Sequence, residues 1–350
     1  MPSIPIGSAI FGDMFGPADM RGLFADEAIV QRYLDVEAAL ATAQAKLGLV
    51  PHDAAEAIAA SANLENIDWQ RLRDRTEVVG YPILPLVEQL SSWHGGDLGQ
   101  WCHWGATTQD IMDTADVLQI RDALALISDD LDGVAAALAG LARDHADTPM
   151  PGRTHLQHAL PITFGYKAAT WLSAIQRHRV RLAEVKTRIG VVSFSGAAGT
   201  LASLGAEDGL ATQEALAVEL GLAVPDITWH TIRDGFAEVT GLLALIAASI
   251  GKIGYDIMLM MQTETGEVLE PFVSGRGASS TMPQKRNPIS SEMMLAAAKI
   301  VREQHSAMLP ARDPGPPHPT WRSVARARSS QRPASSRTRW DFVFAALSTM

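Results

Sequence analysis

Three long stretches of mostly apolar, helix-forming sequence dominate this chain of 350 residues and restrict the folds open to it. They cover about 112–145, 162–189 and 234–263. Helices of roughly 28 to 35 residues reach about 40 to 50 Å, which is more than a small monomer can cover. Their apolar faces therefore need one another and copies of the same chain. The sequence predicts an all-α protein with a long central helical bundle.

The most apolar of these helices runs from about Gly241 to Met261. Lys252, Tyr255 and Asp256 interrupt it, and they would be costly in a lipid-facing span. We expect a buried helix of the bundle rather than a membrane helix.

The first part of the chain contains shorter helical patterns and no strand-like alternation. Apolar residues recur at helical spacing between Ala25 and Leu47, and Gly48 and Pro51 close that helix. Further helices are expected at about 54–61 and 84–94, with a turn around 78–82 and a short helix later at about 206–220. We therefore predict a small helical N-terminal domain over 1–108 and a bundle domain over 109–311.

Three polar segments flank the long helices. The first, residues 101–114, places Thr107, Thr108 and Gln109 directly before a helix. Hydroxyl groups there could act simply as helix caps. Free N–H groups at a helix N-terminus also bind carboxylates, so capping and ligand binding are compatible interpretations.

The second polar segment, residues 149–161, lies between two long helices and is bracketed by prolines, so we expect a loop. It contains His155 and His158 in a His-x-x-His pattern. A metal site is disfavoured because no carboxylate or thiol nearby completes a ligand set.

The third polar segment, residues 275–288, is punctuated by glycines at one end and by proline at the other, so a helix should begin near Pro288. It carries two adjacent serines, the neighbouring cations Lys285 and Arg286, and the amide of Asn287. On composition alone it could be a solvated surface loop. The order of its residues favours a binding site, because Lys285 and Asn287 suit an anion and the serines offer both N–H and hydroxyl groups.

The order of the third segment resembles the signature of the fumarase/aspartase superfamily, Gly-Ser-Ser-x-Met-Pro-x-Lys-x-Asn with a Glu five residues later. Residues 279–287 and Glu292 match, and Ala278 replaces the first glycine. Residues 107–110 occupy the place of the superfamily's Ser/Thr-rich motif, and residues 154–157 match its Thr-His-x-Gln motif. The resemblance covers about 15–311.

Within that superfamily, the chain looks most like the 3-carboxy-cis,cis-muconate cycloisomerases, the lactonising enzymes of protocatechuate and β-ketoadipate catabolism. The segments that carry this likeness are 103–110, 152–159, 229–231 and 262–268. Two positions depart from common patterns. Gln284 stands where a histidine is common, and His155 stands where some cycloisomerases carry another residue.

The resemblance implies an intramolecular addition of a carboxylate to a diene, followed by protonation of carbon. It gives Ser279 the role of proton donor to carbon, or of base in the reverse elimination. Lys285 would stabilise the negative charge that develops beside a carboxylate. In the lyases, the residue matching His155 protonates the leaving group and the residue matching Glu292 orients it. The implied substrate-binding residues are Thr107, Thr108, Gln109, Arg153, Gln157, Ser280 and Asn287.

The resemblance also implies a homotetramer in which each active site draws loops from three subunits. Its substrate would be a small tricarboxylate, and the reaction would need no metal and no organic cofactor. A formal net charge of −10 argues against nucleic acid as a partner. One cysteine, Cys102, excludes an internal disulfide and fits the cytoplasm, and the N-terminus lacks a signal-peptide pattern.

The end of the chain has a different composition. After position 311 there are seven arginines, many serines and prolines, and no lysine or glutamate. This pattern predicts a basic, disordered or altered tail over 312–350.

Two alternatives to the cycloisomerase remain open. One is another lyase of the superfamily, such as one of the adenylosuccinate type, although no phosphate pocket is evident. The other is an inactive helical oligomer that kept the signature.

Overall fold

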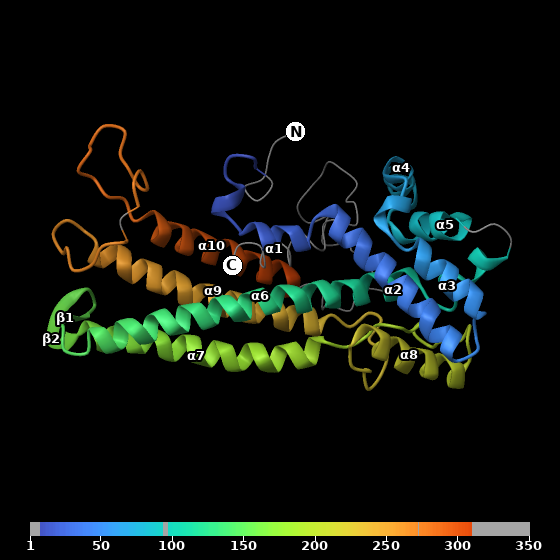
Figure 1. Ribbon diagram of the computed structural model, residues 1–350. Helices are drawn as coiled ribbons and strands as arrows, with labels where there is room; N and C mark the ends of the chain where they lie inside the picture. The colour runs from blue at the N-terminus through green and yellow to red at the C-terminus, as the bar shows by residue number, and fades with distance from the viewer. Residues whose placement is uncertain (1–7, 94–96, 272, 310–350) are drawn as a thin grey trace.

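The computed structural model describes residues 8–93, 97–271 and 273–309, and the chain is mostly α-helical, which confirms the predicted all-α class (Figure 1). The shorter elements of the N-terminal part are η1 (Gly12–Met14), α1 (Ala18–Leu23), α2 (Asp26–Lys46), α3 (His52–Ser61), η2 (Leu64–Asn66), α4 (Trp69–Val79), α5 (Ile83–Trp93) and η3 (Leu98–Trp101). The remaining elements are α6 (Thr108–Asp144), β1 (Pro149–Thr154), β2 (Gln157–Thr163), α7 (Phe164–Ile189), α8 (Ala206–Leu220), α9 (Asp234–Met260) and α10 (Ile289–Met308).

Four long helices form an extended bundle: α6 packs against α7, α7 against α9, and α9 against α10. Figure 1 shows them running side by side along the length of the molecule. Their shared core contains aliphatic and aromatic side chains such as Leu124, Trp171, Ile175, Leu243 and Val301. The long apolar stretches of the sequence thus form the centre of the fold.

Glycines allow α9 and α10 to pack closely. A Cβ atom on Gly251 would lie 2.7 Å from the Cβ of Ala298, and one on Gly254 would lie 2.9 Å from the carbonyl oxygen of Ser291. Such contacts are too short for any larger side chain. The pairing of α9 with α10 therefore depends on small residues, and this pairing sets where the third polar segment leaves the bundle.

Helix α9 has the length and apolar composition of a membrane-crossing helix, with a mean hydropathy of 1.7 and about a third of the window buried within the chain. It packs between α7 and α10 in the bundle. The prediction of a bundle helix agrees with this packing. Much of its apolar surface is left outside the core of one protomer.

A second core surrounds the beginning of α6. Helices α2, α3 and α5 and the later helix α8 supply apolar side chains to it, together with the segment 192–201. Because α6 contributes Ile111 and Leu118 to this core and Leu124 to the bundle core, one helix joins both. The division of the chain at 108/109 stays a prediction.

Most predicted helices lie where the periodicity placed them, and the largest difference of boundary is that α6 begins at Thr108, four residues before the expected start. Helix α4 was missed. Its only buried side chain is Leu72, so no apolar stripe marks it in the sequence. The predicted turn around 78–82 is the end of α4 at Val79 and a left-handed Gly80. The predicted helix end at 94–96 and the tail at 312–350 lie outside the described residues.

The second polar segment is a β-hairpin, and its prediction as a loop was wrong. Strands β1 and β2 pair antiparallel, with Thr154 opposite Gln157, so His155 and Leu156 form a two-residue turn. Both residues have positive φ, 49° and 64°, as in the tight turns that suit the twist of a hairpin. Prolines normally argue against strands, but a two-stranded ribbon has two free edges that accept them.

Candidate functional site

The three polar segments lie at two ends of the bundle. The first is at the N-terminus of α6, whereas the hairpin β1–β2 follows its C-terminus. A helix of 37 residues is about 55 Å long, so these two segments are far apart in one protomer. Figure 1 shows the third polar segment, which precedes α10, at the same end as the hairpin. One chain therefore brings the second and third segments to one end and leaves the first at the other.

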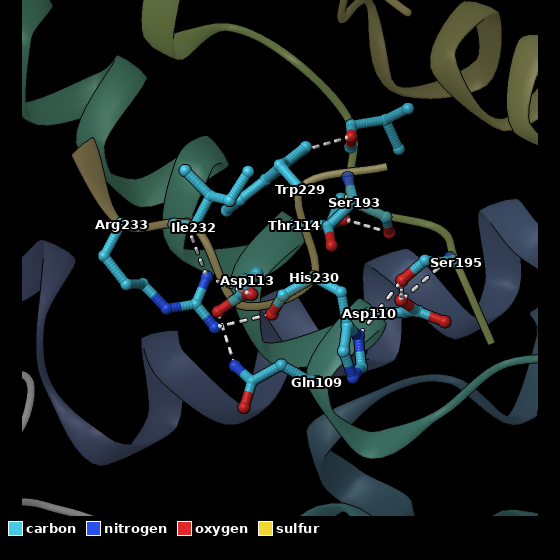
Figure 2. A network of polar contacts seen from close by, with 11 residues as sticks. Gln109, Asp110, Asp113, Thr114, Ser193, Ser195, Trp229, His230, Ile232 and Arg233 are labelled. Carbon is cyan, nitrogen blue, oxygen red and sulfur yellow. Dashed lines mark hydrogen bonds and ion pairs between the residues drawn. The ribbon is translucent and has the colours of Figure 1, made fainter. Parts of the chain in front are cut away.

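The beginning of α6 is organised around the buried carboxylate of Asp110 (Figure 2). It accepts hydrogen bonds from the backbone N–H groups of Thr107 (3.0 Å), Ser195 (2.9 Å) and Gly196 (2.9 Å) and from the hydroxyl of Ser195 (2.9 Å). Burial raises the pKa of this carboxyl, and the hydrogen bonds oppose that shift. The Ser195 hydroxyl also lies 3.1 Å from Nδ1 of His230. Asp110 thus fixes two loops at the helix end directly, and Ser195 links a third through His230.

A buried ion pair lies one turn further along α6. Nη1 of Arg233 donates to Asp113 at 2.7 Å, and Gln109 donates to the other oxygen of the same carboxylate. Nη2 of Arg233 donates to the carbonyl oxygen of His230 at 3.1 Å. The guanidinium also lies over the ring of Trp229, 5.7 Å from its centroid. The ion pair therefore ties the segment before α9 to α6, and the NH₂ group of Gln109 already donates to Asp113.

His103 anchors the loop that leads into α6. Its Nδ1 lies 2.6 Å from the buried carboxylate of Glu37, and its backbone has φ 62°. Burial lowers the pKa of the His103 imidazole, but the charge of Glu37 and its hydrogen bond raise it more, so the net pKa is above the usual value. This pair fixes the loop without using the side chains of Thr107 or Thr108, which are half-buried.

The hairpin presents its predicted site residues to the surface. His155 and Gln157 are exposed, and Leu156 between them is 67% exposed. Arg153 forms a two-pronged salt bridge with Glu267, at 2.5 and 2.8 Å, which ties β1 to the segment after α9. In one protomer Arg153 is thus held by a carboxylate, while His155 projects at the tip.

The third polar segment is closed at its base by Gly277 and Asn287. The Asn287 side chain donates to the Gly277 carbonyl oxygen at 2.9 Å, and its backbone N–H donates to the same oxygen at 3.3 Å. Within the loop, the Ser279 hydroxyl oxygen accepts from the N–H groups of Thr281 (3.3 Å) and Met282 (3.1 Å). Two dipoles therefore point their positive ends at the oxygen of Ser279.

The entry into α10 is fixed by Glu270, whose carboxylate accepts from the N–H groups of Ser290 (3.2 Å) and Ser291 (2.8 Å) and from the Ser291 hydroxyl (2.7 Å). Burial tends to raise the pKa of Glu270, but these hydrogen bonds lower it below its usual value. Ser280, Lys285 and Glu292 are exposed around this frame.

Gly277→Ala is expected to disturb the third polar segment. Gly277 has φ 67°, and an added Cβ atom would lie 2.6 Å from the backbone oxygen of Asn287. A displaced loop should lower kcat/KM by about 10²-fold, as small misplacements of reacting groups do. Gly275→Ala is the matched control, because Gly275 has φ 79° but nothing within 4 Å. Equal losses in steady-state assays of both variants would contradict a role for the Gly277–Asn287 closure.

The hairpin histidines do not form a cluster of metal ligands. Among the residues that the structure describes, no group of three or more histidine, cysteine, aspartate or glutamate side chains could hold a metal ion. His158 lies 3.5 Å from Nη2 of Arg153.

Sequence reasoning missed the residues that organise the beginning of α6: Asp110, Asp113, Ser195, His230 and Arg233. Asp110 and His230 both lie in segments that carry the family resemblance, but each looked like a residue that begins a helix. An acidic residue that is buried at the start of a helix must find hydrogen-bond donors, and this need is a usable signal for such a cluster. Ser195 is 85 positions from Asp110 and Arg233 is 120 positions from Asp113, so no local pattern identifies these partners.

A long helical bundle with polar segments at both ends defines the class, an all-α fold of the lyase type. The model of the family described as Lyase matches residues 14–302. The chain belongs to this lyase family, within the fumarase/aspartase superfamily.

Several curated relatives are similar over most of the chain. It is 47% identical to trans-aconitate decarboxylase 1 of Mycosarcoma maydis over 89% of this chain and 63% of that protein. It is 48% identical to the 3-carboxy-cis,cis-muconate cycloisomerase of Pseudomonas aeruginosa over 85% of this chain and 65% of that protein. The chain thus spans a little less than two thirds of the length of these two relatives.

Solved structures share the fold. The 3-carboxy-cis,cis-muconate lactonizing enzyme from Pseudomonas putida superposes with a TM-score of 0.87 at 40% identity, covering 98% of this chain and 73% of that one. A fumarate lyase from Mesorhizobium sp. BNC1 superposes with a TM-score of 0.80 at 51% identity, covering 96% and 73%. These likenesses agree with the resemblance stated from the sequence.

Proposed function

We propose that this protein is a cycloisomerase that converts 3-carboxy-cis,cis-muconate to a carboxymuconolactone. The observation that carries the proposal is the third polar segment, in which two N–H groups point at the Ser279 hydroxyl. Relatives named 3-carboxy-cis,cis-muconate cycloisomerase at 40 to 48% identity support the substrate.

In the proposed reaction, one substrate carboxylate adds to a carbon of the conjugated system and forms the lactone C–O bond. The electron pair moves to the carbon beside another carboxylate, and that carbon then takes a proton from Ser279. An ordinary serine hydroxyl ionises too weakly for this exchange. The N–H groups of Thr281 and Met282 stabilise the alkoxide that remains, and the ammonium of Lys285 adds to this effect.

Residues of the hairpin have a smaller part in this chemistry. A carboxylate that leaves in the reverse reaction needs no proton, so His155 is not required to protonate it. In a lyase with a poorer leaving group, His155 would donate that proton and Glu292 would orient it. The proposed roles of Arg153 and Gln157 in the hairpin, and of Ser280 and Asn287 in the loop, are to hold substrate carboxylates. Arg153 is already neutralised by Glu267, so any such contact shares its charge.

The beginning of α6 supplies the remaining part of the proposed site. The hydroxyls of Thr107 and Thr108 stand at the N-terminus of a 37-residue helix, where the helix dipole favours an anion. In one protomer this position is about 55 Å from the hairpin. The proposed site is therefore completed by other subunits.

The assembly is expected to be a homotetramer with shared active sites. Apolar side chains on the outside of the bundle include Val180 on α7, 60% exposed, and Leu245 on α9, 54% exposed. A shallow groove along α7 is lined mainly by apolar atoms, between Ala169 and Val180. Multi-angle light scattering at micromolar concentration should give four times the mass of one chain. A monodisperse monomer would contradict both the assembly and the composite site.

A second candidate is another reaction on an unsaturated tricarboxylate, because a relative at 47% identity is named trans-aconitate decarboxylase 1. Purified protein should be incubated with 3-carboxy-cis,cis-muconate while its ultraviolet absorbance is followed. Parallel cuvettes should contain trans-aconitate, N-acetyl-S-(2-succino)cysteine and adenylosuccinate. Loss of absorbance with the first substrate alone supports the proposal, and turnover of any other substrate instead overturns it.

A cytoplasmic location stays a prediction.

A further inference from the structure

We propose that His230 binds a carboxylate of the substrate through its Nε2 atom, and that Ser195 and Asp110 are positioning residues that hold the imidazole for this contact. The inference rests on the proposed function, because it assumes that the beginning of α6 forms part of the active site. Ser195 and His230 lie outside the three polar segments, and they meet Asp110 of the first segment where the fold brings two loops onto the start of α6.

Contacts join Asp110, Ser195 and His230 in that order (Figure 2). The Ser195 hydroxyl donates to Oδ1 of Asp110 at 2.9 Å and lies 3.1 Å from Nδ1 of His230. Asp110 and Ser195 are each 1% exposed, whereas His230 is only half-buried. Asp110 and Ser195 form the buried end of this series of contacts, and His230 at its other end is partly exposed.

The donors around Asp110 fix the direction of the protons in this series of contacts. Every described partner of the Asp110 carboxylate is a donor: the N–H groups of Thr107, Ser195 and Gly196 and the hydroxyl of Ser195. The single proton of the Ser195 hydroxyl is therefore directed to Asp110. The hydroxyl oxygen can then only accept from His230, which assigns a proton to Nδ1. Nε2 is the ring atom left for a ligand.

The charges near the His230 ring are already balanced. Arg233 and Asp113 neutralise each other at 2.7 Å, and Arg233 also holds the His230 carbonyl oxygen. Neither charge of that pair is available to a substrate. The imidazolium form of His230 has one N–H on Ser195 and a second N–H, at Nε2, that can donate to a ligand. The helix terminus and Thr107 lie on the same part of the site, so the contact suits a carboxylate.

Two substitutions separate this role from a structural one. His230→Asn places an amide near the position of Nδ1, so it can keep the contact with Ser195 but has nothing at Nε2. His230→Gln reaches the position of Nε2 but not that of Nδ1. We expect the asparagine variant to raise KM by about 10- to 100-fold, as the loss of a hydrogen bond to a charged group does. The glutamine variant should stay within about fivefold of the wild type, because its amide can donate to the same carboxylate.

The same variants should be titrated by calorimetry with propane-1,2,3-tricarboxylate, a ligand that cannot react. Its Kd should follow the order of the KM values. His305→Asn is the matched control, because His305 makes the same kind of contact, from Nδ1 to the Thr240 hydroxyl at 3.1 Å, away from this cluster. It should change neither constant by more than about twofold. Tight binding of the tricarboxylate by His230→Asn with weak binding by His230→Gln, or an equal loss of affinity in both variants, would overturn the assignment of Nε2.

Ser195→Ala tests the positioning role. It should weaken binding in the wild type, but it should add less than about twofold in the His230→Asn background, because its effect passes through the ring. Equal effects in both backgrounds would show that Ser195 does not act through His230.

The outcomes also distinguish the two proposals. If the wild-type protein binds the tricarboxylate without lactonising 3-carboxymuconate, the proposed function is overturned. The Kd values of the His230 and Ser195 variants still test the role of His230 in that case. A protein that lactonises and shows no difference between asparagine and glutamine overturns the role of His230 alone. A protein that neither binds nor turns over any tricarboxylate overturns both.

Discussion

Ser279→Ala should lower kcat for lactonisation by about 10²- to 10⁴-fold, the usual range for a positioned proton donor. The oxygen that this substitution removes accepts two backbone hydrogen bonds in the third polar segment. Its loss therefore removes the proton that carbon receives and leaves two N–H groups without their acceptor. Steady-state assays at saturating substrate give the effect on kcat directly.

His155→Asn should be compared with Ser279→Ala in the same lactonisation assay. If a carboxylate is the group that adds and leaves, the hairpin histidine has no proton to deliver, and appreciable lactonisation should survive. Ser274→Ala is the matched serine control, because Ser274 is exposed and precedes the loop. It should stay within about twofold of the wild type. Equal and total losses in Ser279→Ala and His155→Asn would favour a lyase in which both groups transfer protons.

Lys285→Met should lower kcat by about 10²- to 10³-fold and raise KM much less. The ammonium is exposed in one protomer, at the face of the third polar segment. Negative charge develops beside the substrate carboxylate mainly in the transition state, so a cation placed there acts on kcat. The expected size matches the removal of one donor that stabilises an oxyanion.

Lys285→Arg should restore little of this activity, since the planar guanidinium is larger and does not present the same point charge. Lys299→Met provides the control, as Lys299 is an exposed lysine on α10 outside the loop. A change in KM alone for Lys285→Met would make Lys285 an anchor for the bound substrate, and its role in the transition state would be wrong.

Periodicity was enough to place the helices that bury one apolar face. The bounds of α8 at 206–220 agree with the prediction, and α2 differs by one residue at each end. Helix α4 shows the limit of this reasoning. It carries charged residues on most of its surface and buries only Leu72, so its helical form comes from capping by Asp68 and from its neighbours.

The polar segments were found from their order in the sequence, but their arrangement was not. The prolines of the hairpin argued against strands in the sequence. Its turn has positive φ at His155 and Leu156, and neither residue type predicts such a turn. The cluster around Asp110 depends on residues from three loops, and only the folded chain brings them together.

The length of α6 has a genetic consequence. On the proposed assembly, a chain with a defective third polar segment still has a sound α6 terminus, and a chain defective at His230 still has a sound loop. Two such alleles expressed together would form mixed tetramers in which some sites contain only intact segments. Each mutant allele alone would give an inactive enzyme, and the two together would restore part of the activity. This complementation is expected because the two defects lie at opposite ends of the 37-residue helix α6.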